Sequence, residues 1–156
     1  VDPDDRRRVG FAERRRLLQQ FEEETRSPAE LLEAWRSGAI KEFVIWKSLS
    51  LRRRKADLFA SGEYEPLEVA GPQAERVVAF RRGDGVLVVA PRLTAPLLAH
   101  AEKPLPTGWG DTVVIPAGLR ARGSDQFTGR RFDLDGAELP VSELLGEFPL
   151  ALLDLE

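Results

Sequence analysis

Acidic and basic side chains lie close together at the start of the chain. Asp2 and Asp4 are followed within a few positions by Arg6 and Arg7. Carboxylates and guanidinium groups hydrogen-bond hydroxyl-rich ligands well, so these four residues are candidates for contact with a sugar. The alternative is that the Asp and Arg side chains pair with one another and brace a loop. The spacing alone leaves both interpretations open.

Three tryptophans and a lysine are further binding candidates. Indole rings stack on the apolar faces of sugar rings, which draws attention to Trp35, Trp46 and Trp109. Trp46 lies within an apolar stretch, so core packing is expected there. Trp109 lies between two glycines in an exposed-looking loop, where stacking on a sugar is conceivable. Lys41 begins the same apolar stretch as Trp46 and could reach a substrate hydroxyl, although a solvated lysine is the simpler interpretation.

The composition excludes several kinds of site. The chain has no cysteine and a single histidine, His100. Disulfides, thiolate metal sites and a cysteine nucleophile are therefore absent, and a zinc cluster or histidine-dependent triad would need residues from another chain. We expect no metal and no cofactor in this chain.

Runs of arginine at residues 6–8, 14–16 and 52–55 raise the possibility of nucleic-acid binding. The formal net charge is −3, however, and acidic residues 22–24 lie beside the basic runs. Neither a membrane-spanning apolar stretch nor a secretory leader is visible. The sequence therefore predicts a cytoplasmic protein without a nucleic-acid or membrane partner.

Helical patterns fill the first part of the chain. Residues 11–26 place apolar side chains at helical spacing, and Ser27-Pro28 with Glu30 predicts the start of a second helix that ends at Gly38. A third helix is predicted over residues 40–59. It is apolar on more than one side, and the two preceding helices offer it too little partner surface. We therefore expect it to lie against a body absent from these residues.

The pattern changes near residue 62. Short apolar runs predict strands over residues 66–70, 76–82, 86–92, 112–116, 126–128, 131–134 and 150–155, with a tight hairpin at residues 83–85. The charge changes as well: residues 1–56 hold 14 basic and 10 acidic residues, whereas residues 57–156 hold 9 and 16. The frequent turns favour an antiparallel sandwich or open barrel.

Residues 1–7, VDPDDRR, resemble the DPDNRR loop that follows the last barrel strand in many α-amylase superfamily enzymes. The rest of the chain resembles, in order, the carboxy-terminal portion of the maltooligosyl trehalose synthase family, the (1→4)-α-D-glucan 1-α-D-glucosylmutases. The matching stretches are residues 35–41, 44–49, 51–54, 57–67, 77–82, 88–93, 109–112 and 148–153. The opening loop departs from the family because Asp5, Arg8 and Gly10 stand where Asn, Pro and Asp are usual.

This resemblance implies an α+β chain in two parts. Residues 1–62 would be the end of a catalytic (β/α)₈ barrel, and residues 63–156 an all-β antiparallel sandwich domain. The whole enzyme would convert the reducing-end α-1,4 linkage of a maltooligosaccharide to α-1,1, using carboxylates that all lie upstream of Val1. The partner would be the missing amino-terminal barrel. We expect the chain to be a fragment that supports the barrel and is inactive alone.

A second hypothesis is that residues 63–156 form a stand-alone α-glucan-binding β module. Its motivation is Trp109 in an exposed-looking loop. A purely structural β domain is a third possibility.

Overall fold

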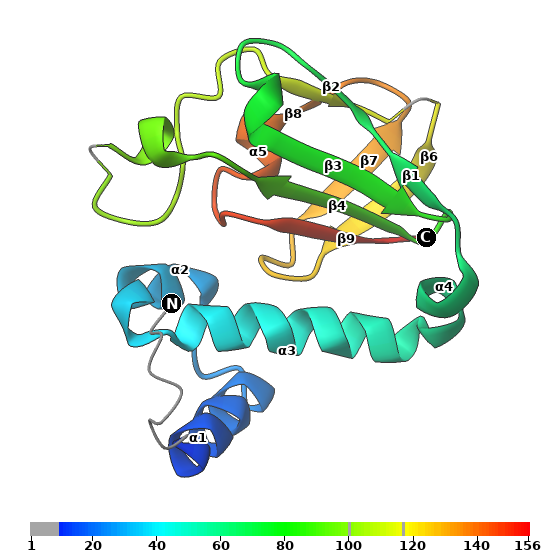
Figure 1. Ribbon diagram of the computed structural model, residues 1–156. Coiled ribbons are helices and arrows are strands. Elements are labelled where there is room, and N and C mark those ends of the chain that lie inside the picture. Colours follow the sequence, from blue (N-terminus) through cyan, green and yellow to red (C-terminus); the bar gives the residue numbers. More distant parts are fainter. Residues whose placement is uncertain (1–9, 100, 117) are drawn as a thin grey trace.

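Helices form the first third of the chain, and strands joined by turns and loops follow in the computed structural model, which describes residues 10–99, 101–116 and 118–156 (Figure 1). The helices are α1 (Phe11–Glu22), α2 (Pro28–Glu33), α3 (Ala39–Arg54), α4 (Ala56–Ser61) and α5 (Val141–Leu144), with 3₁₀ turns η1 (Trp35–Ser37), η2 (Ala74–Arg76) and η3 (Ala95–Leu98). The strands are β1 (Tyr64–Pro66), β2 (Glu68–Ala70), β3 (Val77–Arg82), β4 (Val86–Pro91), β5 (Val113–Ile115), β6 (Arg120–Asp125), β7 (Arg131–Asp135), β8 (Leu139–Pro140) and β9 (Ala151–Leu155).

Local sequence explains how the helices begin. The Glu30 backbone amide donates to Ser27 Oγ at 3.3 Å, and the Ser27 amide donates to the Glu30 carboxylate at 2.7 Å. This reciprocal capping box, followed by Pro28, starts α2 as predicted. Gly38 then adopts φ +80°, a conformation that glycine tolerates best, and the chain turns directly into α3.

Two helix boundaries differ from the prediction. The first helix ends at Glu22 rather than near residue 26, and Glu24 has left helical geometry with φ +52°. The helix predicted over residues 40–59 is two helices, because Lys55 leaves helical geometry between α3 and α4. Its Nζ donates to the carbonyl oxygens of Gly85 and Leu155, each at 3.0 Å. The break directs α4 toward the sheet.

Two antiparallel sheets form the rest of the chain. The larger has the strand order β1-β3-β4-β9-β6-β7 and the smaller β2-β5-β8. The β3–β4 hairpin pairs Val77 with Pro91 and Arg82 with Val86, around the predicted turn at residues 83–85. Helices α1 to α4 lie beneath the larger sheet, with α3 running along it, whereas α5 lies on the other side, next to β8 (Figure 1). The chain is therefore a mixed helix and antiparallel-sheet structure, as predicted.

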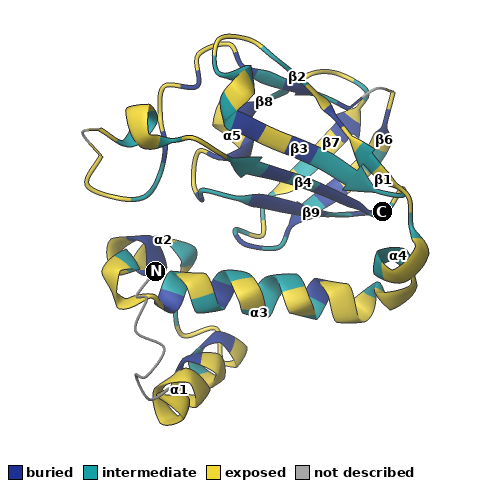
Figure 2. Ribbon diagram, in the orientation of Figure 1, coloured by how far each residue is buried: buried dark blue, intermediate teal, exposed yellow. Residues whose placement is uncertain are grey.

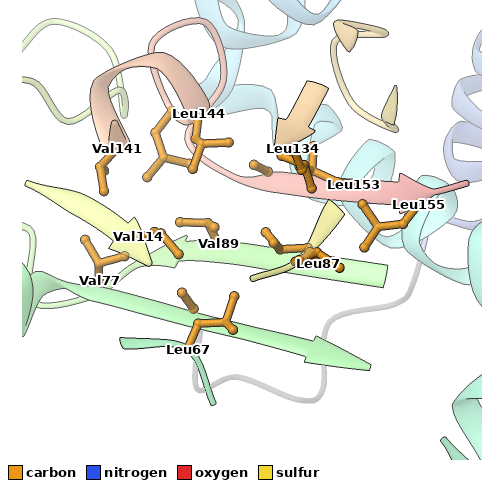
Figure 3. Close-up of a cluster of buried hydrophobic side chains, with 14 of the residues drawn as sticks. Leu67, Val77, Leu87, Val89, Val114, Leu134, Val141, Leu144, Leu153 and Leu155 are labelled. Carbon is orange, nitrogen blue, oxygen red and sulfur yellow. The ribbon is translucent and has the colours of Figure 1, made fainter. Parts of the chain in front are cut away.

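The larger sheet has a buried core on each face. The inter-sheet core consists of Leu67, Val77, Ala79, Leu87, Val89, Trp109, Val114, Leu119, Leu134, Val141, Leu144, Leu145, Ala151, Leu153 and Leu155. The helix–sheet core consists of Leu17, Phe21, Leu31, Leu32, Ala39, Phe43, Leu51, Val86, Phe127, Phe148 and Leu152. Side chains of the inter-sheet core point toward one another between the strands (Figure 3). The central strands β4 and β9 contain no exposed residue, because each contributes side chains to both cores (Figure 2).

The helical residues and the sheet thus share a core. Phe43 of α3 lies 6.3 Å from the Phe127 ring and 6.0 Å from the Phe148 ring, measured between centroids. The sequence predicted that the third helix packs against a body outside this chain. Part of its apolar surface instead packs against the chain's own sheet. The division at residues 62 and 63 into two domains stays a prediction.

Two strand predictions were wrong. Residues 66–70 are not one strand: β1 pairs with β3 and β2 with β5, and the buried Leu67 marks the crossing between sheets. Residues 126–128 form a turn, and the strand is β6 immediately before it. The sequence of β6, RARGSD, lacks large apolar residues. At its Gly123 there is no room for a larger side chain, since an added Cβ would lie only 3.2–3.3 Å from Leu153 and Leu155.

Candidate functional site

Lys41 lines a cleft of about 490 Å³ between α1 and the start of α3. The lysine is exposed, and Glu13, Arg14 and Glu42 line the same cleft. Arg14 approaches Glu42 at 3.7 Å, and hydrogen bonds from Arg16 hold the pKa of Glu13 below its ordinary value of 4.5. The cleft is therefore lined by charges of both signs, which could bind hydroxyl groups.

The other predicted site residues fall elsewhere. Asp2, Asp4, Arg6 and Arg7 lie outside the described residues, as does His100. The predicted contact of the four opening residues with a sugar stays a prediction. Trp35, one turn before α3, is half-buried and has the Arg36 guanidinium 4.5 Å from its ring centre.

Trp109 is not the exposed residue that the sequence indicated. It is 3% exposed and belongs to the inter-sheet core. Its carbonyl oxygen accepts the Thr112 hydroxyl at 2.5 Å, and that hydroxyl accepts the Gln73 amide at 3.0 Å, so the loop folds inward. The indole nitrogen is buried without a hydrogen-bond partner among the described residues. A ring enclosed in this way cannot stack on a sugar.

A second cleft, of about 420 Å³, opens where the helices meet the turn after β6. Phe21, Phe43 and Trp46 line it, but the two phenylalanines are only 2% and 4% exposed. Trp46 packs against both rings, as its core assignment predicted, and the Lys47 ammonium lies 5.0 Å from its ring centre. Little aromatic surface remains for a sugar, so this cleft is a weak binding candidate.

Asp125, at the end of β6, is a carboxylate that sequence reasoning missed. It is 2% exposed. One oxygen accepts the Thr128 amide at 3.0 Å and the Thr128 hydroxyl at 2.6 Å, and the other accepts the Leu152 amide at 3.0 Å. Aspartate favours turns because its carboxylate accepts hydrogen bonds from nearby backbone amides, and this preference could have indicated the role. Its oxygens hold the turn against β9.

Asp154 links α3 to the sheet. Lys55 Nζ lies 2.6 Å from one of its oxygens and Arg54 lies 3.2 Å from the other. Arg54 also donates to Gln126 at 2.6 Å. The residues are distant in sequence, so no local pattern could have predicted the contact. Like Asp125, this carboxylate is engaged in holding the fold.

The described residues contain no cluster of three or more Asp, Glu, His or Cys side chains that could hold a metal ion. Among the same residues, no helix has the length and apolar character needed to cross a membrane.

No family model matches the chain. It is 36% identical over 154 residues to proteins from two strains of Mycobacterium tuberculosis, each carrying the provisional name maltooligosyl trehalose synthase. The match covers 98% of this chain but only 16% of those relatives.

Solved structures give the same result. The chain matches maltooligosyltrehalose synthase from Arthrobacter ramosus with a TM-score of 0.74 and 36% identity, over 100% of this chain and 18% of that one. A further maltooligosyl trehalose synthase structure, at 22% identity and a TM-score of 0.58, supports the fold alone. The predicted resemblance to a carboxy-terminal portion of these enzymes is confirmed.

Proposed function

We propose that this chain is the carboxy-terminal part of a maltooligosyl trehalose synthase, in which its helices complete a (β/α)₈ barrel and its sheets buttress that barrel. The observation that carries the proposal is the match along nearly the whole chain to a small share of each relative. The roles of Asp125 and Asp154 support a structural part, because their oxygens are engaged within the fold.

The reaction of the complete enzyme would be an isomerisation. The α-1,4 bond between the last two glucose units breaks, and C1 of the penultimate unit bonds to the anomeric oxygen of the released glucose. Its proton passes to the freed O4, so no water is consumed. Retaining chemistry of this kind uses two carboxyl groups about 5 Å apart. We place these groups in the preceding part of the enzyme.

Lys41 is the described residue that we propose to contact substrate, together with Asp2, Asp4, Arg6 and Arg7. The cleft beside Lys41 supports this, because it opens at the start of α3 and offers charged hydrogen-bonding groups. In the complete enzyme, Lys41→Ala should raise the KM for maltopentaose, whereas Lys47→Ala, on the same helix, should leave it unchanged. If the two substitutions change the KM equally, Lys41 does not contact the substrate.

The main experiment is a complementation assay. Maltopentaose is incubated with this chain alone, with the portion of the Arthrobacter ramosus enzyme outside the matched region alone, and with the two together. We expect no trehalosyl product from either piece and product from the mixture. Turnover by this chain alone would overturn the proposal, and so would an amino-terminal portion that is fully active without it. The stand-alone glucan-binding alternative has lost its motivation, because Trp109 is buried.

A further inference from the structure

An apolar groove of about 310 Å³ runs between α3 and the larger sheet. Val44 and Leu49 line it from α3, Phe59 from α4, and Val88 and Leu150 from the sheet side. Its lining is apolar except for Ser48 and Arg52. The helix–sheet core therefore lies open along this side of α3.

The apolar surface continues from the groove across the sheet. Val88 pairs in register with Phe80 of β3, and alternation along the strand places Val78 on the same face. The Tyr64 ring lies 4.9 Å from the Phe80 ring. Val78 is 38% exposed and Tyr64 is 53% exposed. This face of the sheet is thus only partly covered by the helices.

The surface also extends along α3. Leu49 is 56% exposed, and Ile45, one turn earlier, is 48% exposed. We name the whole surface the docking face, and define it as the groove together with Ile45, Tyr64, Val78 and Phe80. Contiguous apolar surface of this kind marks an interaction site more often than scattered single residues do.

The groove is unsuited to a glucan. Sugar hydroxyls need several hydrogen-bond partners, and the lining supplies polar groups only from Ser48 and Arg52. A protein partner with an apolar surface fits better. The partner should also carry acidic groups, because α3 is basic. Its sequence holds five Lys or Arg residues and one acidic residue, Glu42. Arg52, which lines the groove, is exposed, and so is Arg53, the next residue of α3.

We propose that the docking face binds the preceding part of a maltooligosyl trehalose synthase through an apolar surface flanked by carboxylates. This inference rests on the proposed function, and it adds which surface makes the contact. It is supported by the length of the relatives, because the chain matches only 16% of each, so a large body is available to cover the face. The basic flank of α3 supports acidic groups on that body.

Isothermal titration tests the inference. The chain is titrated with the portion of the Arthrobacter ramosus enzyme outside the matched 18%. Leu49→Asp places a charge in the face and should weaken binding at least about tenfold, and Arg52→Glu should weaken it about threefold or more. The matched control is Leu93→Asp, because Leu93 is 61% exposed but lies outside the face. It should bind like the wild type.

Circular dichroism establishes that each variant folds, and Tyr64→Asp, on β1, replaces Leu49→Asp if that variant does not fold. Wild-type binding that none of the face variants weakens would overturn the docking face and leave the proposed function intact. No wild-type binding, with no activity in the mixture, would overturn both. A dimer of the chain in sedimentation that Leu49→Asp disrupts, with no effect of this variant on the titration, would assign the face to a second copy instead.

Discussion

The shared core predicts that a change in α3 loosens strands far away in the sequence. Phe43 is 4% exposed and contacts the rings of Phe21, Phe127 and Phe148. Phe43→Ala leaves a cavity where the helix meets the sheet. If the helical and sheet parts unfold as one unit, the loss of stability must appear in both.

The size of the effect follows from the burial. Replacing a buried Phe by Ala costs about 3–5 kcal/mol, and each 1.4 kcal/mol changes an equilibrium about tenfold. Global opening should therefore become roughly a hundred- to several thousand-fold more frequent. The matched control is Phe11→Ala on α1, because Phe11 is 73% exposed. That change should alter stability by no more than about 0.5 kcal/mol.

Hydrogen exchange read by mass spectrometry measures the two parts separately. Peptides from α3 and from β4 and β9 should both exchange faster in Phe43→Ala, by similar factors, when reclosing is faster than exchange. Exchange that rises in α3 while the strands keep their wild-type protection would refute the reasoning. The helices and the sandwich would then be independent units, and an isolated sandwich would be expected to fold.

Three further outcomes are expected. Asp154→Asn removes the charge that Lys55 contacts, and it should lower the free energy of unfolding in urea by about 1–2 kcal/mol, because the pair is only partly buried. As a control, Asp133→Asn, at an exposed and longer ion pair, should lower it by less than about 0.5 kcal/mol. Trp109→Ala should lower the free energy of unfolding by about 3–5 kcal/mol, because the ring is buried. A saturable change in fluorescence on adding maltopentaose, seen in the wild type and absent in Trp109→Phe, would restore the stacking hypothesis. The backbone hydrogen bond from the helix cap lowers the pKa of Glu30 below 4.5, so its ionised form stabilises α2 above pH 4.5 and this stabilisation is lost as the pH falls through the lower folded value. The stability difference between wild type and Glu30→Gln should therefore shrink in acid, and a constant difference from neutral pH to pH 3 would contradict this.

Features that depend on neighbouring residues were predictable from the sequence. The capping box at Ser27 and Glu30 satisfies backbone groups within one turn, and the hairpin at residues 83–85 joins two strands of strong β propensity. Both are local, so their patterns survive in any tertiary context. The resemblance to a known family added the prediction that the chain matches the carboxy-terminal portion of a larger enzyme, which these local patterns could not supply.

Features that depend on distant contacts were not predictable. Trp109 lies in a glycine-flanked loop, yet Thr112 and Gln73 hold that loop inward. The β6 strand has a weak apolar signal, and it forms through its pairing with β7 and β9. The helix break at Lys55 accompanies contacts with the ends of two strands. Each of these outcomes is fixed by residues that become neighbours only after folding.

The two sides of α3 have different roles: one side contributes to the stability of this chain, and we propose that the other contributes to its assembly with the rest of the enzyme. Phe43 and Leu51 face the chain's own sheet and are buried, whereas Ile45 and Leu49 are about half exposed. A substitution on the first side should therefore lower stability in the isolated chain, and one on the second should leave that stability almost unchanged. If the docking face is covered in the complete enzyme, Leu49→Asp should destabilise that enzyme much more than the isolated chain. Equal effects in the two forms would mean that the exposed side of α3 remains in water after assembly.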